Sequence, residues 1–258
     1  MNSFLIDSHA HIYLDQFSDS LDSVIKKSHD NRVEKILMPN INIDTIKPML
    51  QISRKYEDIC YPMLGLHPCY LTENYESEIN KIFKYLDATI VAVGEIGIDL
   101  FRSRENYKDQ VKAMEMQCEI ALDNNLPIVI HTRNSIDETI EIVQRYSKRN
   151  LTGVFHCFVG SYNQAKKIID LGFKLGIGGI LTFKNSDLRN IISKINLEDI
   201  LLETDSPYLS PEPNRGKINN PSNLIFIGKK LSQINSLPMD LVCQVTSQNA
   251  INLFDLSS

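Results

Sequence analysis

Tryptophan is absent from the sequence, cysteine is scarce, and positive charge is not in excess. The five cysteines are odd in number and include no Cys-x-x-Cys pair, which argues against a disulfide framework and favours a reducing compartment. Lysine and arginine total 27 against 32 aspartates and glutamates, so the formal net charge is −5. A broad basic surface that coats nucleic acid is therefore not expected, whereas a local phosphate-binding pocket remains open.

Long apolar runs are also missing. No stretch approaches 18 uninterrupted apolar residues, so we expect no transmembrane helix and no membrane association. The first residues, MNSFLIDSHAHIY, lack the basic and then apolar segments of a signal peptide, and a cytoplasmic protein is expected. No linker or low-complexity tract divides the chain, which predicts one domain over residues 1–258. The oligomeric state is open, and a monomer is compatible with the sequence.

Eight short apolar runs, rich in valine, isoleucine, leucine and phenylalanine, alternate with longer amphipathic stretches. Several runs are apolar throughout, as expected for strands of a parallel sheet that is buried on both faces. A strand followed by a helix, repeated eight times, predicts an α/β fold of the (β/α)₈ TIM-barrel type. The predicted strands cover residues 4–7, 35–39, 60–67, 89–97, 126–132, 152–158, 172–179 and 199–205.

Helical spacing of apolar residues predicts the intervening elements. A loop rich in proline and asparagine, residues 206–223, follows the eighth strand, a position where functional loops often lie. The predicted helices cover residues 20–30, 43–57, 75–86, 105–124, 137–149, 162–171, 187–195, 221–234 and 239–254.

Residues that can bind a metal recur at the ends of the predicted strands. In DSHAHIY (7–13) two histidines flank one alanine, and residues two apart on a strand point to the same face. The carboxyl ends of barrel strands converge on one mouth, where active sites form. The strand-end residues are His9, His11, His67, Glu95, His131, His156 and Asp205, whereas the sixth histidine, His29, lies in a predicted helix and is expected on the surface.

Each of these residues has a simpler explanation when it is taken alone. A single histidine at a strand end is usually a hydrogen-bonded polar residue, and Asp205 could cap the segment that follows it. Glu95 is harder to explain, because a buried carboxylate is rare without a partner. Five histidines and two acids at the same end of different strands instead predict a functional cluster. The neighbouring Cys69 and Cys157 are interpreted as packing residues.

Imidazole and carboxylate ligands suit divalent ions such as Zn, Mn, Co or Ni. Glu95 is the candidate for a carboxylate shared by two ions, because its strand lies near the middle of the series of strands that carry the candidate ligands. Asp205 could bind metal and also accept the proton of an attacking water. The six candidate ligands, His9, His11, Glu95, His131, His156 and Asp205, exceed one tetrahedral site and fit two adjacent divalent ions.

The ordered motifs DSHAHI, GLHP, VGEIGID, PIVIHTR, FHCFVGS, ETDSPYL and RGKINNP resemble the TatD family of metal-dependent hydrolases, in the amidohydrolase superfamily. The resemblance covers nearly the whole chain and implies a (β/α)₈ barrel with a binuclear site. It implies that His9 and His11 bind one ion, that His131 and His156 bind the second, and that Glu95 bridges them. The ions would be Zn, Mg or Mn.

The resemblance also implies roles outside the metal ligands. Asp205 matches the last ligand and the base, and His67 matches a histidine that faces substrate. Arg133 and Arg215 are candidates for phosphate contact, although a surface salt bridge would explain Arg215 nearly as well. The family often has aspartate where Tyr13 lies in this sequence, and some members have glutamate before the proline of Asn219-Asn220-Pro221. These departures are expected to alter nearby hydrogen bonds and substrate contacts and leave the ligand set intact.

Three hypotheses for function follow. The resemblance implies a metal-dependent deoxyribonuclease, and our first hypothesis is an exonuclease that acts on single-stranded DNA or 3′ ends. The absence of tryptophan weighs against it. The aromatic residues Tyr13, Phe101, Phe158, Phe183 and Tyr208 could stack on bases, although core packing or loop anchoring explains each of them better. The second hypothesis is an amide, ester or aminoacyl-tRNA hydrolase that uses the same site, because a barrel alone does not determine its reaction. The third is a metal-binding barrel without turnover.

Overall fold

The computed structural model describes residues 3–101 and 103–256. Within them, eight strands and nine α-helices alternate along the chain. Apolar residues fill the strands, and the β4 sequence VGEIGID is buried at every position. The strands are β1 (Leu5–Asp7), β2 (Val33–Pro39), β3 (Cys60–Met63), β4 (Val93–Asp99), β5 (Ile128–Arg133), β6 (Gly153–Phe155), β7 (Lys174–Ile177) and β8 (Ile200–Leu202).

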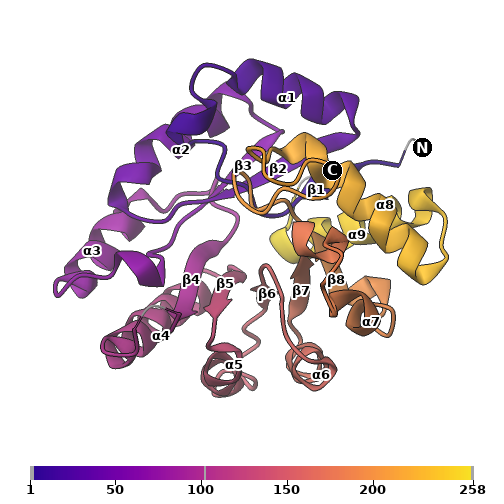
Figure 1. The fold of residues 1–258 in the computed structure, drawn as a ribbon. Coiled ribbons are helices and arrows are strands. Elements are labelled where there is room, and N and C mark those ends of the chain that lie inside the picture. Colours follow the sequence, from indigo (N-terminus) through magenta and orange to yellow (C-terminus); the bar gives the residue numbers. More distant parts are fainter. Residues whose placement is uncertain (1–2, 102, 257–258) are drawn as a thin grey trace.

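The helices follow the strands in the expected order and surround them (Figure 1). Capping residues determine where some helices begin. Asn42, for example, accepts hydrogen bonds from the backbone of Asp44 and Thr45 and forms a capping box at the start of the second helix. The helices are α1 (Leu21–Asp30), α2 (Ile43–Lys55), α3 (Tyr75–Ile82), α4 (Tyr107–Asp123), α5 (Ile136–Gln144), α6 (Tyr162–Asp170), α7 (Leu188–Ile192), α8 (Leu224–Asn235) and α9 (Met239–Phe254).

All neighbouring strands are parallel, in two hydrogen-bonded sheets with the orders β1-β2-β3 and β4-β5-β6-β7-β8. Backbone contacts join the two sheets at both margins. The amide of Gly94 donates to the carbonyl of Leu64 over 2.8 Å, and the amide of Ser8 donates to the carbonyl of Leu202 over 3.0 Å. The predicted fold class, a parallel-stranded α/β barrel, is confirmed.

Most predicted elements are present, but several strands end earlier than predicted. β3 ends at Met63 rather than residue 67, β6 at Phe155 rather than residue 158, and β8 at Leu202 rather than residue 205. The apolar run continues in sequence while the chain leaves the sheet. Many of the polar residues assigned to strand ends therefore lie in the loops that follow, at the mouth formed by the carboxyl ends of the strands.

The interior of the barrel contains an apolar layer beneath this mouth. It joins side chains from several strands, among them Ile6, Val129 and Val154, to Phe254 of α9. Because Val129 and Val154 precede His131 and His156 by two residues, they point into the barrel on the same side of their strands. Helix α9 therefore covers the barrel at the end opposite the mouth. Among the described residues, no helix is long and apolar enough to cross a membrane.

Candidate metal centre

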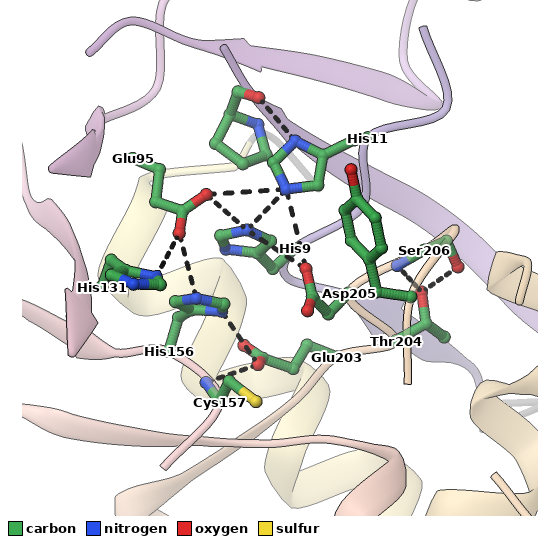
Figure 2. A network of polar contacts seen from close by, with 12 residues as sticks. His9, His11, Glu95, His131, His156, Cys157, Glu203, Thr204, Asp205 and Ser206 are labelled. Atoms are coloured by element: carbon green, nitrogen blue, oxygen red, sulfur yellow. Dashed lines mark hydrogen bonds and ion pairs between the residues drawn. The ribbon is translucent and has the colours of Figure 1, made fainter. Parts of the chain in front are cut away.

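Glu95 lies at the centre of the polar cluster. The pairing of β4 with β5 shifts register between Gly94 and Ile96, so Glu95 occupies a bulge in an otherwise regular parallel ladder. Bulges change the direction of a side chain and are frequent beside functional sites. The carboxylate of Glu95 is only 3 % exposed, and both of its oxygens face histidine nitrogens (Figure 2).

Three histidines surround one oxygen of this carboxylate. Glu95 Oε1 lies 2.9 Å from Nδ1 of His131, 3.1 Å from Nε2 of His156 and 3.3 Å from Nε2 of His67. His131 is the fourth residue of β5, and His156 directly follows β6. These side chains therefore reach Glu95 from consecutive strands of the larger sheet, as the convergence of strand ends predicts.

The other oxygen faces the histidine pair near the start of the chain. Glu95 Oε2 lies 3.3 Å from Nε2 of His9 and 3.5 Å from Nε2 of His11. The two Nε2 atoms are 3.2 Å apart, and Asp205 Oδ1 lies 3.9 Å from the first and 3.6 Å from the second. The predicted alternation along a strand is wrong here, because β1 ends at Asp7 and both histidines lie in the following loop. Their rings nevertheless converge.

A glycine allows β4 and β5 to approach closely at this point. Gly97 pairs with His131, and a Cβ atom at Gly97 would lie 2.1 Å from the carbonyl oxygen of His131. Its φ of +142° is also one that residues with side chains rarely adopt. The sequence VGEIGID therefore brings the backbone of Glu95 within reach of His131.

The hydrogen bonds behind two rings determine which nitrogen carries a proton. Nδ1 of His11 lies 3.2 Å from the carbonyl oxygen of Pro39 and 2.8 Å from the hydroxyl of Tyr13, which itself donates to that carbonyl over 2.6 Å. Nδ1 of His156 lies 3.2 Å from a carboxylate oxygen of Glu203. Since these partners accept, Nδ1 carries the proton in both rings when they are neutral. The Nε2 lone pairs then point into the cluster, as metal binding requires.

His131 and His67 differ in the nitrogen that their neighbours leave facing the cluster. Nε2 of His131 lies 3.1 Å from Asp99 Oδ2, so a proton held there by Asp99 leaves the Nδ1 lone pair of the neutral ring facing Glu95 and the cluster. Nδ1 of His67 accepts from the amide of Cys69 over 3.0 Å, so its Nε2 carries the proton and faces the cluster as a donor. His67 thus has the hydrogen-bonding character of a substrate contact rather than of a ligand.

Charge within the cluster shifts several pKa values. Burial alone would raise the pKa of Glu95, but His67, His156 and His9 hold it well below its ordinary value. Burial alone would lower the pKa of His156, but Glu95 and Glu203 hold it well above its ordinary value. Burial dominates at His9, whose pKa is lowered. These shifts describe a buried site in which carboxylates keep their charge and share protons with imidazoles.

The donor set fits divalent cations. Three groups of side chains bring ligand atoms within 4.8 Å of one another: His9 with His11 and Asp205, His67 with Glu95 and His131, and His9 with His156 and Glu203. Imidazole nitrogens and carboxylate oxygens in this density suit transition-metal ions and tolerate harder ones. The six residues predicted as ligands from the sequence all lie in this one cluster.

The predicted phosphate-contacting residues lie in loops and strand ends at the mouth. Arg133, the last residue of β5, places its guanidinium 3.7 Å from the ring centroid of Phe101, and Arg215 lies 4.1 Å from that of Phe183. Both arginines are exposed. Neither lies among the ion pairs of the described residues, so the surface salt bridge considered for Arg215 is not present there.

The structure decides several smaller predictions. Tyr13 and Phe158 are buried, so core packing is confirmed for both and neither can stack on bases. Cys69 is exposed rather than packed, and its Sγ lies 3.4 Å from Asp99 Oδ2. Cys157 has left the strand, and its amide donates to Glu203. His29 is exposed as expected.

Two carboxylates behind the histidines were missed in the sequence. Asp99 lies behind His131, and Glu203 lies behind His156 with no exposed surface. Both interrupt apolar runs, GEIGID and LLETD, as Glu95 does. The rule that a buried carboxylate needs a partner would have identified them as well.

The comparison with protein families now adds to this geometry. A family model described as TatD related DNase matches residues 6–255. The chain belongs to the TatD family. The resemblance inferred from the motifs is thereby confirmed, and the chain is a metal-dependent hydrolase of the TatD family.

Several relatives of this TatD-family chain are similar over their full length. The uncharacterized metal-dependent hydrolase BU355 of Buchnera aphidicola is 36 % identical over 98 % of this chain and 100 % of its own. The uncharacterized metal-dependent hydrolase YabD of Bacillus subtilis is 30 % identical, with the same coverage of both chains. The crystal structure of YjjV, a TatD homolog from Escherichia coli K12, has a TM-score of 0.92 and 29 % identity and covers 98 % of each chain.

Proposed function

We propose that this TatD-family hydrolase is a deoxyribonuclease that removes nucleotides from single-stranded DNA or 3′ ends. The single observation that carries the proposal is the shared carboxylate of Glu95. One of its oxygens faces His131 and His156, and the other faces His9 and His11. One carboxylate between two sets of imidazoles is the arrangement expected for two adjacent divalent ions, a pair used in phosphodiester hydrolysis.

Within this proposal, each ion has its own ligands. His9, His11 and Asp205 would hold one ion, His131 and His156 would hold the other, and Glu95 would contribute a carboxylate to both. The hydrogen bonds behind His11, His131 and His156 support the division, because a proton kept on the outer nitrogen of each neutral ring leaves a lone pair on the nitrogen that faces the cluster. When bound, divalent ions activate a water molecule and stabilise the attacking and leaving oxygens; Zn, Mg and Mn are all candidates.

The chain's own groups supply the remaining chemistry. Asp205, whose pKa is held below its ordinary value by His11, His156 and His9 against the effect of burial, is ionised and accepts the proton of the attacking water. His67 directs its Nε2–H at an oxygen of the scissile phosphate. Arg133 and Arg215 present guanidinium edges to neighbouring phosphates while the flat faces rest on Phe101 and Phe183.

The test is metal-dependent shortening of a labelled oligonucleotide. Metal-stripped protein is incubated with single-stranded DNA labelled at its 5′ end, and Mg, Mn or Zn is added back. We expect stepwise shortening that a chelator abolishes. We expect the Asp205→Asn variant to lose at least about 100-fold in rate, since a positioned base contributes that much or more. A variant at an exposed acid remote from the cluster, Glu57→Gln, serves as the matched control.

The opposite results are equally informative. If no metal restores cleavage of any DNA substrate, the deoxyribonuclease proposal is wrong. Hydrolysis of ester or aminoacyl substrates by the same protein, again lost in the Asp205→Asn variant, would then identify the second hypothesis. Inactivity on all three classes would favour a metal-binding barrel without turnover.

A further inference from the structure

Exposed apolar side chains gather around the mouth of the barrel. Among the described residues, eight large hydrophobic side chains are strongly exposed, and five of them lie between the carboxyl end of a strand and the next helix. These five are Tyr70, Phe101, Val159, Tyr208 and Ile218. Such a collection around a polar site indicates contact with a ligand, because scattered exposure would not favour one end of the fold.

Two tyrosines in this group flank the metal centre. The ring centroid of Tyr70 lies 6.0 Å from that of His67, and the ring of Tyr208 lies 6.2 Å from that of His11. The two rings therefore approach the cluster beside different oxygens of Glu95. Tyr70 is 44 % exposed and Tyr208 is 51 % exposed, so each presents much of its ring to solvent.

Positive charge accompanies these rings. Arg133 and Arg215 each lie flat on an aromatic ring, Phe101 and Phe183. Stacking holds a guanidinium in place while its N–H edges stay available for an anion. The mouth thus combines aromatic faces with cationic edges around a phosphodiester-cleaving centre. A single-stranded nucleic acid has the complementary pattern, because unpaired bases alternate with phosphates.

We propose that Tyr70 and Tyr208 form a stacking site for the unpaired terminal base of a single-stranded oligonucleotide, with Arg133 and Arg215 holding the phosphates on either side. The inference rests on the proposed nuclease function and deepens it by naming the residues that recognise an unpaired end. A base within a duplex is stacked and paired and cannot offer its faces to these rings. Phosphate esters without a base would use the arginines but gain nothing from the tyrosines.

The test measures binding rather than turnover. Metal-loaded protein is titrated into short single-stranded DNA that carries 2-aminopurine as the terminal base, at the 3′ end in one probe and at the 5′ end in another. Phosphorothioate linkages slow cleavage. Stacking on Tyr70 or Tyr208 quenches the fluorescence of the probe whose end enters the site. We expect Tyr70→Ala and Tyr208→Ala each to weaken binding roughly 5- to 100-fold and to restore fluorescence, whereas the phenylalanine variants keep both.

Two controls separate stacking from general damage. Tyr85 lies in the turn after α3, at the opposite end of the barrel, and is also exposed, so Tyr85→Ala should bind as the unchanged protein does. A probe with an abasic terminal nucleotide should bind more weakly and should not respond to the tyrosine variants. Arg133→Ala and Arg215→Ala should weaken both probes equally and lower the salt dependence of binding by about 0.7 per arginine.

The outcomes distinguish this inference from the function on which it rests. If the protein cleaves DNA but both tyrosine-to-alanine variants bind and quench as before, the stacking site is wrong and the nuclease proposal stands. An abasic probe that binds as tightly as the normal one leads to the same conclusion. If the unchanged protein neither binds nor cleaves DNA with any metal, both proposals fail.

Discussion

The histidines of the candidate metal centre are held by polar groups that lie behind their rings. Glu203 Oε1 lies 3.2 Å from Nδ1 of His156 and also accepts from the amide of Cys157 over 2.6 Å. Asp99 holds His131, and Tyr13 together with a backbone carbonyl holds His11. Such partners fix the orientation and protonation state of a ligand before any ion binds.

Replacement of Glu203 tests this support. We expect Glu203→Gln to weaken metal binding about 10- to 100-fold, because an amide holds the His156 ring less strongly and cannot favour the protonated Nδ1 as a carboxylate does. Competition against a chromogenic chelator measures the affinity directly. The exposed Glu57→Gln variant should retain full affinity. Equal affinity in the two variants would mean that packing alone orients His156.

Asp7 predicts a pH dependence of stability. Burial raises its pKa to about 8, although hydrogen bonds from Thr204 and from the amide of His9 act in the opposite direction. In the unfolded chain the pKa of an aspartate is about 3.8. Between pH 3.8 and about 8, the folded state therefore holds a proton that the unfolded state has lost. Stability from this group is therefore complete below pH 3.8 and declines as the pH rises to about 8.

The measurement compares two proteins. Asparagine has the shape and the donor of the protonated acid, so Asp7→Asn should not lose stability over this interval. Urea unfolding of the metal-stripped proteins gives the unfolding free energy of each. We expect the unfolding free energy of Asp7→Asn, relative to that of the unchanged chain, to increase from pH 6 to pH 8 and then to level off. A constant difference across that range would show that Asp7 is already ionised in the fold.

The candidate ligands could be predicted from sequence, while their supporting partners were not. Candidate ligands such as His131 interrupt apolar runs in the carboxyl halves of the predicted strands, and the convergence of parallel strands brings such positions together whatever the local details. The partners depend on the direction of each ring. The sequence does not distinguish His67, whose Nδ1 accepts a hydrogen bond from the backbone, from His156, whose Nδ1 donates a hydrogen bond to Glu203.

At the scale of elements, the approach of β4 to β5 depends on Gly97. A methyl group there would lie 2.1 Å from the carbonyl oxygen of His131, and the backbone would also be strained at φ +142°. Gly172 offers a matched control, because it also has positive φ, +86°, but no atom lies within 4 Å of the corresponding position. The comparison between the two glycines separates conformational strain from steric contact.

We expect Gly172→Ala to cost about 1 kcal/mol of unfolding free energy from strain alone. Gly97→Ala should lose a further 1–3 kcal/mol or so because the strands must separate. Urea denaturation gives both values. Metal affinity should fall only in Gly97→Ala, since His131 moves with β5. Equal losses of stability in the two variants would contradict the close approach.

The ends of the elements were the least predictable part of the fold. The apolar run TGVFHCF continues through Phe158, but β6 ends at Phe155, and Cys157 adopts a positive φ of 47°. Asp205 has a φ of 55°, three residues after the end of β8. Burial continues beyond the strand because the loop folds over the mouth. Hydrophobicity therefore indicates what is buried, whereas hydrogen bonding across the sheet determines where each strand stops.

At the scale of the molecule, the two ends of the barrel differ in composition. The carboxyl end gathers the charged cluster, and the opposite end is closed by an apolar layer to which α9 contributes Ala250 and Phe254. The sequence pattern predicts the helix over residues 239–254, but it does not predict that this helix packs across the end of the barrel. The amphipathic pattern of a helix predicts that one of its faces is buried but does not predict which elements that face packs against.

This division predicts that stability and metal binding can be separated by mutation. Phe254 is almost fully buried among strand side chains such as Ile6, Leu37 and Met63, so Phe254→Ala should lower the unfolding free energy by about 3–5 kcal/mol. The metal affinity of the folded protein should not change, because the apolar layer lies between Phe254 and the cluster. Asn252→Ala, on the exposed face of the same helix, should cost less than about 0.5 kcal/mol. Urea denaturation and chelator competition test both parts, and a parallel loss of metal affinity in Phe254→Ala would show that closure of the far end also shapes the centre.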